Sequence, residues 1–214
     1  MRTFFKLAAG LVLPALVLAG CSEAEAEAEP EITYPSQSVT ESTEAPTEEP
    51  TTALVPPTKE ELYPYPKPVM PEAAKARTKE GAMAFAVYVA EIYAYSIAIR
   101  DPQPLMDVCT DVAEFCKFYK SEIERSIETD TYRVGYAMQD LEPTGALEGG
   151  TTDRVEWGAQ VVGYTAPYVL REGAEGETTR VAPLHFVFGV EVAWLDGWKV
   201  EEAQALPYEE VYDD

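Results

Sequence analysis

The 214-residue chain changes composition sharply near residue 62, and this change limits which part of it is able to form a hydrophobic core. Residues 22–61 consist mainly of Glu, Thr, Ser, Pro and Ala. Such a segment buries too little apolar surface to offset the conformational entropy lost on folding, so we expect residues 21–61 to be a disordered acidic tether. The domain is expected over residues 62–214, beginning with the stiff, proline-rich stretch Tyr63–Pro68.

The first 21 residues have the pattern of a bacterial lipoprotein signal. Two basic residues precede the apolar run Leu7–Ala19, and small residues stand directly before a cysteine in Leu18-Ala19-Gly20-Cys21. We predict that residues 1–20 are a signal peptide, and that Cys21 receives a diacylglyceryl group and becomes the new N-terminus. Acyl chains such as palmitate would then hold the protein on the outer face of the cell membrane.

The charge of the chain excludes one class of partner. The sequence has 16 Lys and Arg residues against 38 Asp and Glu residues, a net charge of −22; cleavage before Cys21 removes Arg2 and Lys6 and no acidic residue, which leaves −24. A surface this acidic repels phosphate backbones, so we expect no nucleic-acid partner. The chain has no loop of the calcium-binding pattern D-x-[DN]-x-[DN]-G, and we predict neither a metal site nor another cofactor.

Two further cysteines, Cys109 and Cys116, would be expected to pair in an oxidising extracytoplasmic compartment. Geometry raises an objection, because seven residues of continuous helix separate two Cα atoms by ~10 Å, whereas a disulfide needs less than ~7 Å. A bridge therefore requires Cys109 to fold back from a loop and the following helix to begin after it. The sequence leaves both states of this pair open.

The domain is expected to open with a helix over Glu72–Arg100, after Pro71 and before the stop at Asp101-Pro102. Its centre, Gly81–Ile99, is nearly all apolar and as long as a membrane span. Ala and Tyr dominate it, and Glu91 would be costly in hydrocarbon, so we expect a buried central helix with apolar residues on two faces.

A second, amphipathic helix is expected over Val112–Glu128, because Asp111 and Glu114 form a start that resembles a capping box. From Thr131 onward apolar residues recur at every second position, which is typical of strands. We expect four of them: one from Tyr132 to about Pro143, one from Val155 to about Leu170 with a bend near Ala166-Pro167, one from Thr178 to Leu195, and one from Trp198 to Ala205.

The turn between the last two strands decides which side chains face inward. A two-residue Asp-Gly turn would place Trp194 and Trp198 on different faces. A three-residue loop, Leu195–Gly197 with Gly197 left-handed, pairs Trp194 with Trp198 and collects the large apolar residues on one face, so we predict this register. It sends four polar residues to the opposite face: His185, Glu191, Lys199 and Glu201.

Helices followed by a long bent antiparallel sheet that ends in Asp-Gly-Trp-Lys-Val resemble the cone-shaped fold of nuclear transport factor two and ketosteroid isomerase. The segment Pro71–Phe85, with the following Tyr-rich helix and cysteine pair, is similar to a family of actinobacterial secreted lipoproteins of uncharacterised function. The resemblance implies an α+β domain with N-terminal helices packed on a bent, cone-like antiparallel sheet. It implies no activity, because this fold hosts enzymes, binding modules and parts of larger assemblies.

Few residues suggest chemistry. His185 is the sole histidine and is expected away from the apolar face, which argues against a hydrolase. Glu91, flanked by Tyr88 and Tyr95, is the one acid embedded in an apolar helix, and it is either a general base with a raised pKa or a structural acid near the helix edge. These three residues form the candidate pocket; no catalytic residue is assigned.

We therefore expect a non-catalytic module in the cell envelope. It would bind either a small apolar ligand inside the cone or an envelope protein through the sheet. The alternative is an isomerase or dehydratase that uses Glu91 as a carboxylate base in the cavity. The aromatic residues of the strands are expected to form the core or to line that cavity: Trp157, Phe186, Phe188, Trp194 and Trp198.

Overall fold

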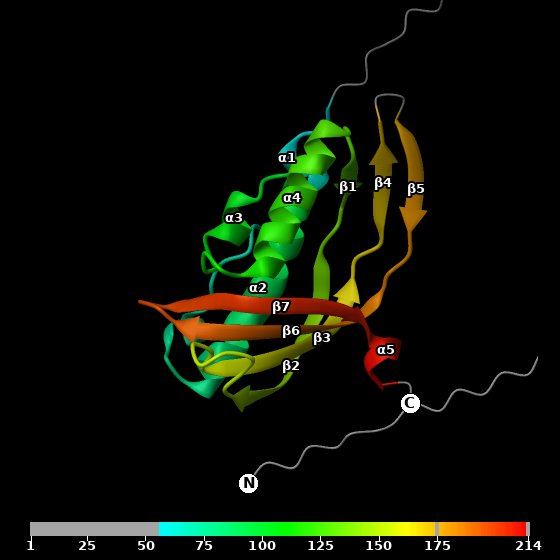
Figure 1. The fold of residues 1–214 in the computed structure, drawn as a ribbon. Coiled ribbons are helices and arrows are strands. Elements are labelled where there is room, and N and C mark those ends of the chain that lie inside the picture. The colour runs from blue at the N-terminus through cyan, green and yellow to red at the C-terminus, as the bar shows by residue number, and fades with distance from the viewer. Residues whose placement is uncertain (1–55, 174–175, 213–214) are drawn as a thin grey trace, which may run out of the picture. The chain divides into compact units, whose positions relative to one another are not determined.

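A computed structural model describes residues 56–173 and 176–212 (Figure 1). The expected signal peptide, Cys21 and the tether up to residue 55 lie outside the described residues. All the described residues belong to one compact unit. Its described part is mixed α+β, as expected, with helices α1 (Lys59–Leu62), α2 (Lys79–Ile99), α3 (Gln103–Met106), α4 (Glu114–Glu128) and α5 (Tyr208–Tyr212), and a 3-10 turn over Glu72–Lys75.

Helix α2 begins later than the sequence indicates. The expected single helix from Glu72 is wrong, because the chain leaves the helical path after Lys75 and restarts at Thr78, whose side chain accepts a hydrogen bond from the Gly81 amide. The carbonyl of Ala76 lies so close to the first turn of α2 that a Cβ on Gly81 would be 1.9 Å from its oxygen. That carbonyl accepts the indole N–H of Trp198 at 2.9 Å, so the break ties the start of α2 to the last strand.

Among the described residues, α2 is the one helix that is long and apolar enough to cross a membrane by length and composition. In the structure, 67% of its most apolar window is buried within the domain. Side chains on opposite sides of α2 are buried, with Phe85 and Val89 on one side and Ala94 on the other. This burial is that of a core helix, as the two apolar faces predict.

Helix α4 begins at Glu114, two residues after the expected start, and Asp111 does not cap it. The first turn is instead capped from a distant strand, where the Glu202 carboxylate accepts a hydrogen bond from the Phe115 amide at 3.2 Å. The late start leaves Cys109 in the preceding loop, and a disulfide joins it to Cys116 with the Cα atoms 6.5 Å apart. The bridge therefore exists in the way that the geometric objection required.

The strands form two antiparallel sheets, one of three strands in the order β1-β4-β5 and one of four in the order β2-β3-β6-β7. Figure 1 shows the four-stranded sheet crossing α2 and the three-stranded sheet standing beside α4. Their bounds are β1 Tyr132–Val134, β2 Met138–Glu148, β3 Trp157–Thr165, β4 Tyr168–Glu172, β5 Glu177–Val181, β6 His185–Trp194 and β7 Trp198–Pro207.

The chain passes from one sheet into the other three times, at residues 135–137, 166–167 and 182–184. The second passage is the bend expected at Ala166-Pro167. The other two passages were not expected. The predicted first strand is interrupted at Gly135, whose φ of 82° is left-handed, and the predicted third strand is interrupted after Val181. The first expected strand also continues past Pro143 to Glu148 through two irregular steps of register.

The β6–β7 hairpin has the predicted register, with Trp194 paired to Trp198 and Val192 to Val200. Gly197 has a positive φ of 134°, and Asp196 before it also has a positive φ, of 55°. A bulge follows, in which Glu201 is the extra residue of β7. Glu201 is consequently buried, and its carboxylate lies 2.9 Å from the guanidinium of Arg154.

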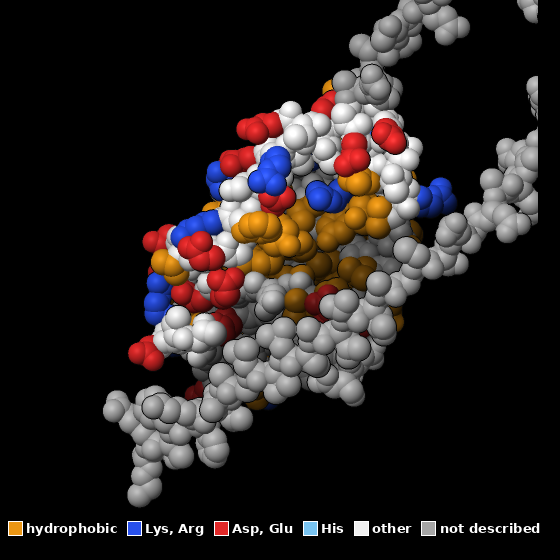
Figure 2. Space-filling model, turned by 45° about the vertical axis from the view of Figure 1, so that its right-hand side comes forward, with side chains coloured by type: hydrophobic (Ala, Val, Ile, Leu, Met, Phe, Trp, Pro, Cys, Tyr) orange, Lys and Arg blue, Asp and Glu red, His pale blue; other side chains and the backbone are white. Residues whose placement is uncertain are grey.

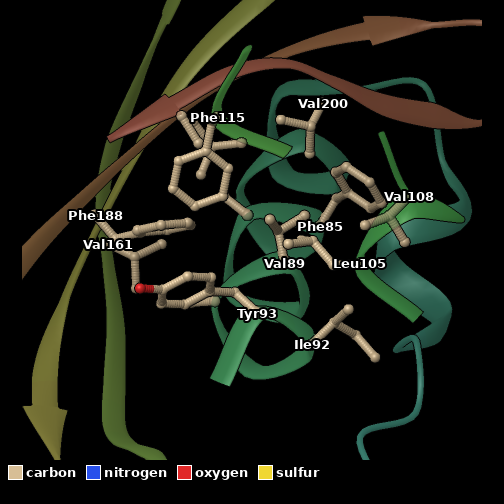
Figure 3. Close-up of a cluster of buried hydrophobic side chains, with 14 of the residues drawn as sticks. Phe85, Val89, Ile92, Tyr93, Leu105, Val108, Phe115, Val161, Phe188 and Val200 are labelled. Atoms are coloured by element: carbon tan, nitrogen blue, oxygen red, sulfur yellow. The ribbon is translucent and has the colours of Figure 1, made fainter. Parts of the chain in front are cut away.

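The core fills the space between α2, α4 and the inner face of the four-stranded sheet. Figure 3 shows Phe115 and Phe188 close together, with Tyr93 reaching from α2 towards Val161 and Phe188. The ring of Phe188 lies 5.7 Å from that of Phe115 and is stacked at 5.9 Å on that of Tyr93. The expected aromatic core is confirmed for three residues that are almost fully buried and two that are partly so: Phe186, Phe188 and Trp198, then Trp157 and Trp194.

Candidate functional site: a tyrosine-lined pocket

A pocket of ≈ 310 Å³ opens where helices α2 and α4 face strands β1 and β4. In Figure 2, hydrophobic side chains gather in a hollow near the centre of the face shown, with acidic and basic side chains along part of its edge. Residues from both helices, from strands β1 and β4 and from the β1–β2 connection line the pocket: Tyr93, Ile97, Phe118, Tyr119, Glu122, Ile123, Arg133, Tyr136 and Tyr168.

The two helices supply one wall through their ordinary spacing. Tyr93 and Ile97 are four residues apart on α2, and Tyr119 and Ile123 are four residues apart on α4, so each pair lies on one helix face. Phe118 adds an exposed ring at the edge, with 57% of its surface accessible. The packing of α2 and α4 in the core therefore fixes the orientation of this wall.

A turn at Gly135 shapes the opposite wall. Arg133 and Tyr136 are three residues apart, and an unbroken strand would point them to opposite faces of the sheet. The left-handed φ of Gly135 and a hydrogen bond from the Tyr136 amide to the Arg133 carbonyl turn the chain, and both side chains line the same pocket. The Gly135 amide in turn donates to the Leu62 carbonyl at 2.8 Å, so α1 holds this turn in place.

Three tyrosines meet at the bottom of the pocket. The rings of Tyr93 and Tyr119 pack edge to face at 4.6 Å, and Tyr136 lines the same pocket. Burial raises the pKa of Tyr136 to about 12, although the Tyr93 hydroxyl and the nearby Arg133 guanidinium oppose the rise. Burial, together with Tyr136 and Tyr119, raises the pKa of Tyr93 well above its usual range. The hydroxyls of Tyr93 and Tyr136 are therefore neutral hydrogen-bonding groups at physiological pH.

Two charged residues complete the lining. The carboxylate of Glu122 forms an ion pair with the guanidinium of Arg125, three residues further along α4, with an N–O distance of 2.9 Å. Arg133 makes no ion pair within the part of the chain that the structure describes. The pocket thus offers an uncompensated positive charge beside hydrogen-bonding hydroxyls and aromatic rings.

Glu91, the candidate acid from the sequence, lies elsewhere. It is half-buried on α2 and lines a separate pocket of ≈ 510 Å³ with residues 138–141 of β2. Burial raises the pKa of its carboxyl, and its charge contributes to the raised pKa values of Tyr88 and Tyr63. Neither Tyr88 nor Tyr95 lines that pocket; the Tyr95 ring packs edge to face on Tyr63 at 5.0 Å.

His185 is part of an aromatic stack at the start of β6. Its ring lies between those of Tyr164 and Tyr208, at 4.4 Å and 3.8 Å with both planes nearly parallel to it. It lines none of the pockets described here. Among the described residues, no group of three or more His, Cys, Asp or Glu side chains is placed to hold a metal ion.

The sequence contained a weak signal for the pocket. Tyr119 belongs to the expected apolar face of the second helix and Tyr136 to the alternating pattern of the first strand, where both look like ordinary core residues. Tyr93 lies among the apolar residues of α2, where only the position of the opposing turn distinguishes it from Tyr88 or Tyr95. Arg133 is a more distinctive signal than these tyrosines, because it is a single basic residue within the alternating apolar pattern of the first strand.

Comparison with known families matches residues 64–184, more than half of the chain, to a family described as "Family of unknown function (DUF6318)". All the residues that line the pocket fall within this range. No curated protein matches the chain. The expected membership of an uncharacterised family is thereby confirmed: the chain belongs to the family of unknown function DUF6318.

Proposed function

We propose that this protein is a lipid-anchored envelope protein whose folded domain binds a small, largely apolar ligand in the tyrosine-lined pocket. The observation that carries the proposal is the pocket itself: tyrosines from two helices, strand β4 and the β1–β2 connection converge on one space of ≈ 310 Å³. Pockets for small ligands are typically apolar spaces of about this size with a few convergent polar groups.

The geometry favours binding over catalysis. Tyr93 and Tyr136 hold raised pKa values and stay protonated, so neither is a base near neutral pH. Glu122 is the one carboxylate in the lining, and Arg125 pairs with it. Glu91, on which the alternative of an isomerase or dehydratase depends, lines a different pocket. We therefore prefer a binding module to an enzyme.

The proposed location rests on the sequence and on the disulfide. The lipobox Leu18-Ala19-Gly20-Cys21 would place the lipid on Cys21, and the residues up to Leu62 would separate the domain from the membrane. The bridge between Cys109 and Cys116 supports an extracytoplasmic location, because disulfides persist in oxidising compartments.

We also propose that the domain is a variant of the cone-shaped fold of nuclear transport factor two and ketosteroid isomerase. Helices precede the sheets in the chain, the chain passes repeatedly from one sheet into the other, and strands of both sheets contact α2. The pocket lies between the helices and the sheet, as a cavity inside a cone would. This likeness supports a ligand in the interior and says nothing about a reaction.

A binding screen tests the proposal. The lipid-free chain of residues 22–214, which contains the whole compact unit, is labelled with ¹³C-tyrosine and titrated with small aromatic and branched aliphatic compounds. We expect selected compounds to shift the ring signals of Tyr93, Tyr119 and Tyr136.

The variant Phe118→Ala should weaken this binding, because it removes an exposed ring at the edge of the pocket. Val69→Ala is the matched control, since Val69 is exposed and does not line the pocket. A screen in which no compound shifts these signals, or in which both variants behave alike, would refute the proposal.

A further inference from the structure

We infer that the ligand of this pocket is a small organic carboxylate with an aromatic or branched apolar body, and that Arg133 and Tyr136 bind its carboxylate. This inference rests on the proposed function and adds the chemical class of the ligand. It is carried by the charge of the lining, by the hydrogen-bond donors beside that charge, and by the shape of the walls.

The charge is the first argument. In a chain with a net charge of −22, basic groups are few and most described arginines lie beside acids. Arg133 instead lines the pocket and has no acidic partner among the described residues. The neighbouring Glu122 is paired with Arg125, so it does not cancel the charge of Arg133. The pocket therefore has one positive charge that a ligand with one negative charge would match.

The donors are the second argument. Arg133 and Tyr136 line the same pocket, because the turn at Gly135 brings both side chains to it. The Tyr136 hydroxyl keeps its proton near neutral pH, because its pKa is raised to about 12, and a protonated hydroxyl can donate a hydrogen bond. A carboxylate has two oxygens that accept several hydrogen bonds and fits a guanidinium in a bidentate manner. A neutral ligand would leave the Arg133 charge unmatched.

The walls are the third argument. Apart from Arg133 and Glu122, the lining consists of rings and branched side chains. Tyr119 packs on Tyr93, Tyr168 packs edge to face on Tyr136 at 5.1 Å, and Ile97 and Ile123 also line the pocket. Such surfaces pack against flat rings and branched chains. A volume of ≈ 310 Å³ suits a body of one or two rings.

The test uses pairs of probes that differ only in charge. Benzoate, 3-phenylpropionate and 2-naphthoate are each compared with the matching neutral carboxamide by isothermal titration calorimetry on the chain of residues 22–214. We expect at least one carboxylate to bind at least about tenfold more tightly than its amide, since ionised hydrogen bonds are stronger than neutral ones.

The residue assignment is tested on the same pairs. Arg133→Gln should lower the affinity for the preferred carboxylate at least about tenfold and leave the affinity for the amide unchanged. Arg133→Lys should retain part of the preference for the carboxylate. Arg180→Gln, on the exposed strand β5, is the control. If the wild-type chain binds each acid and its amide with equal affinity, the inference is overturned and the proposed function still stands. The same holds if neutral ligands bind to the pocket and no carboxylate does. If neither these pairs nor the broader screen shifts the pocket tyrosines, both fail.

Discussion

Reduction of the Cys109–Cys116 disulfide should destabilise the domain by a predictable amount. The bridge closes a loop with a sequence separation of 7 residues. The chain-entropy relation for a loop of about eight residues gives ~2.5 kcal/mol of stabilisation at 25 °C, because the cross-link restricts the unfolded chain. For a domain of this size that loss lowers the melting temperature by about 5–10 °C.

The assay compares chemical unfolding of the oxidised and the dithiothreitol-reduced chain. Reduction keeps both sulfur atoms in place, so it isolates the cross-link from the packing of Cys116, which is fully buried. The double variant Cys109→Ala/Cys116→Ala should be insensitive to dithiothreitol. The Thr110 amide, which donates to the Val200 carbonyl at 2.9 Å, reports by hydrogen exchange whether the loop leaves β7.

Two results would refute this reasoning. Equal unfolding free energies of the oxidised and reduced chain would show that the bridge does not restrict the unfolded state. Rapid exchange of Thr110 in the reduced chain, together with a loss well above ~2.5 kcal/mol, would show that the bridge holds native packing as well as closing a loop.

Three further predictions concern single residues. Gly81→Ala should destabilise the domain by about 2 kcal/mol or more in urea unfolding, because the new Cβ would meet the Ala76 carbonyl, whereas Gly145→Ala, with open space around the Cβ, should change stability by less than about 0.5 kcal/mol. The free energy of unfolding should fall between about pH 10 and pH 12, because in that range Tyr136 loses its proton in the unfolded chain but keeps it in the folded chain, where its pKa is about 12. Tyr136→Phe should reduce this fall in unfolding curves taken across that range. Cys21→Ala should release the protein from the membrane fraction on immunoblots, and continued retention would contradict a single lipid anchor.

The candidate site shows where reasoning from local pattern stops. Glu91 is conspicuous in the sequence because it is a carboxyl in an apolar helix, and it lines a pocket with residues 138–141. The tyrosine-lined pocket is a separate one, and its tyrosines are not conspicuous in the sequence. Its lining comes from segments far apart in the chain, and Tyr93 and Tyr168 meet only after the sheet has folded. No periodicity within one segment indicates which of several tyrosines will face a common space.

The sequence by itself determined the features that depend on neighbouring residues. The apolar faces of α2 indicated a central helix, Ala166-Pro167 indicated the bend, and the apolar residues around Asp196-Gly197 indicated the hairpin register, because each depends on local periodicity or on the conformations that a turn permits. The tertiary structure decided the rest. The Trp198 indole donates a hydrogen bond to the Ala76 carbonyl, 122 residues away, at the point where the expected first helix is interrupted. Glu202 caps α4 from 87 residues away. Such contacts satisfy backbone groups across the fold, and they exist only once packing has brought distant segments together.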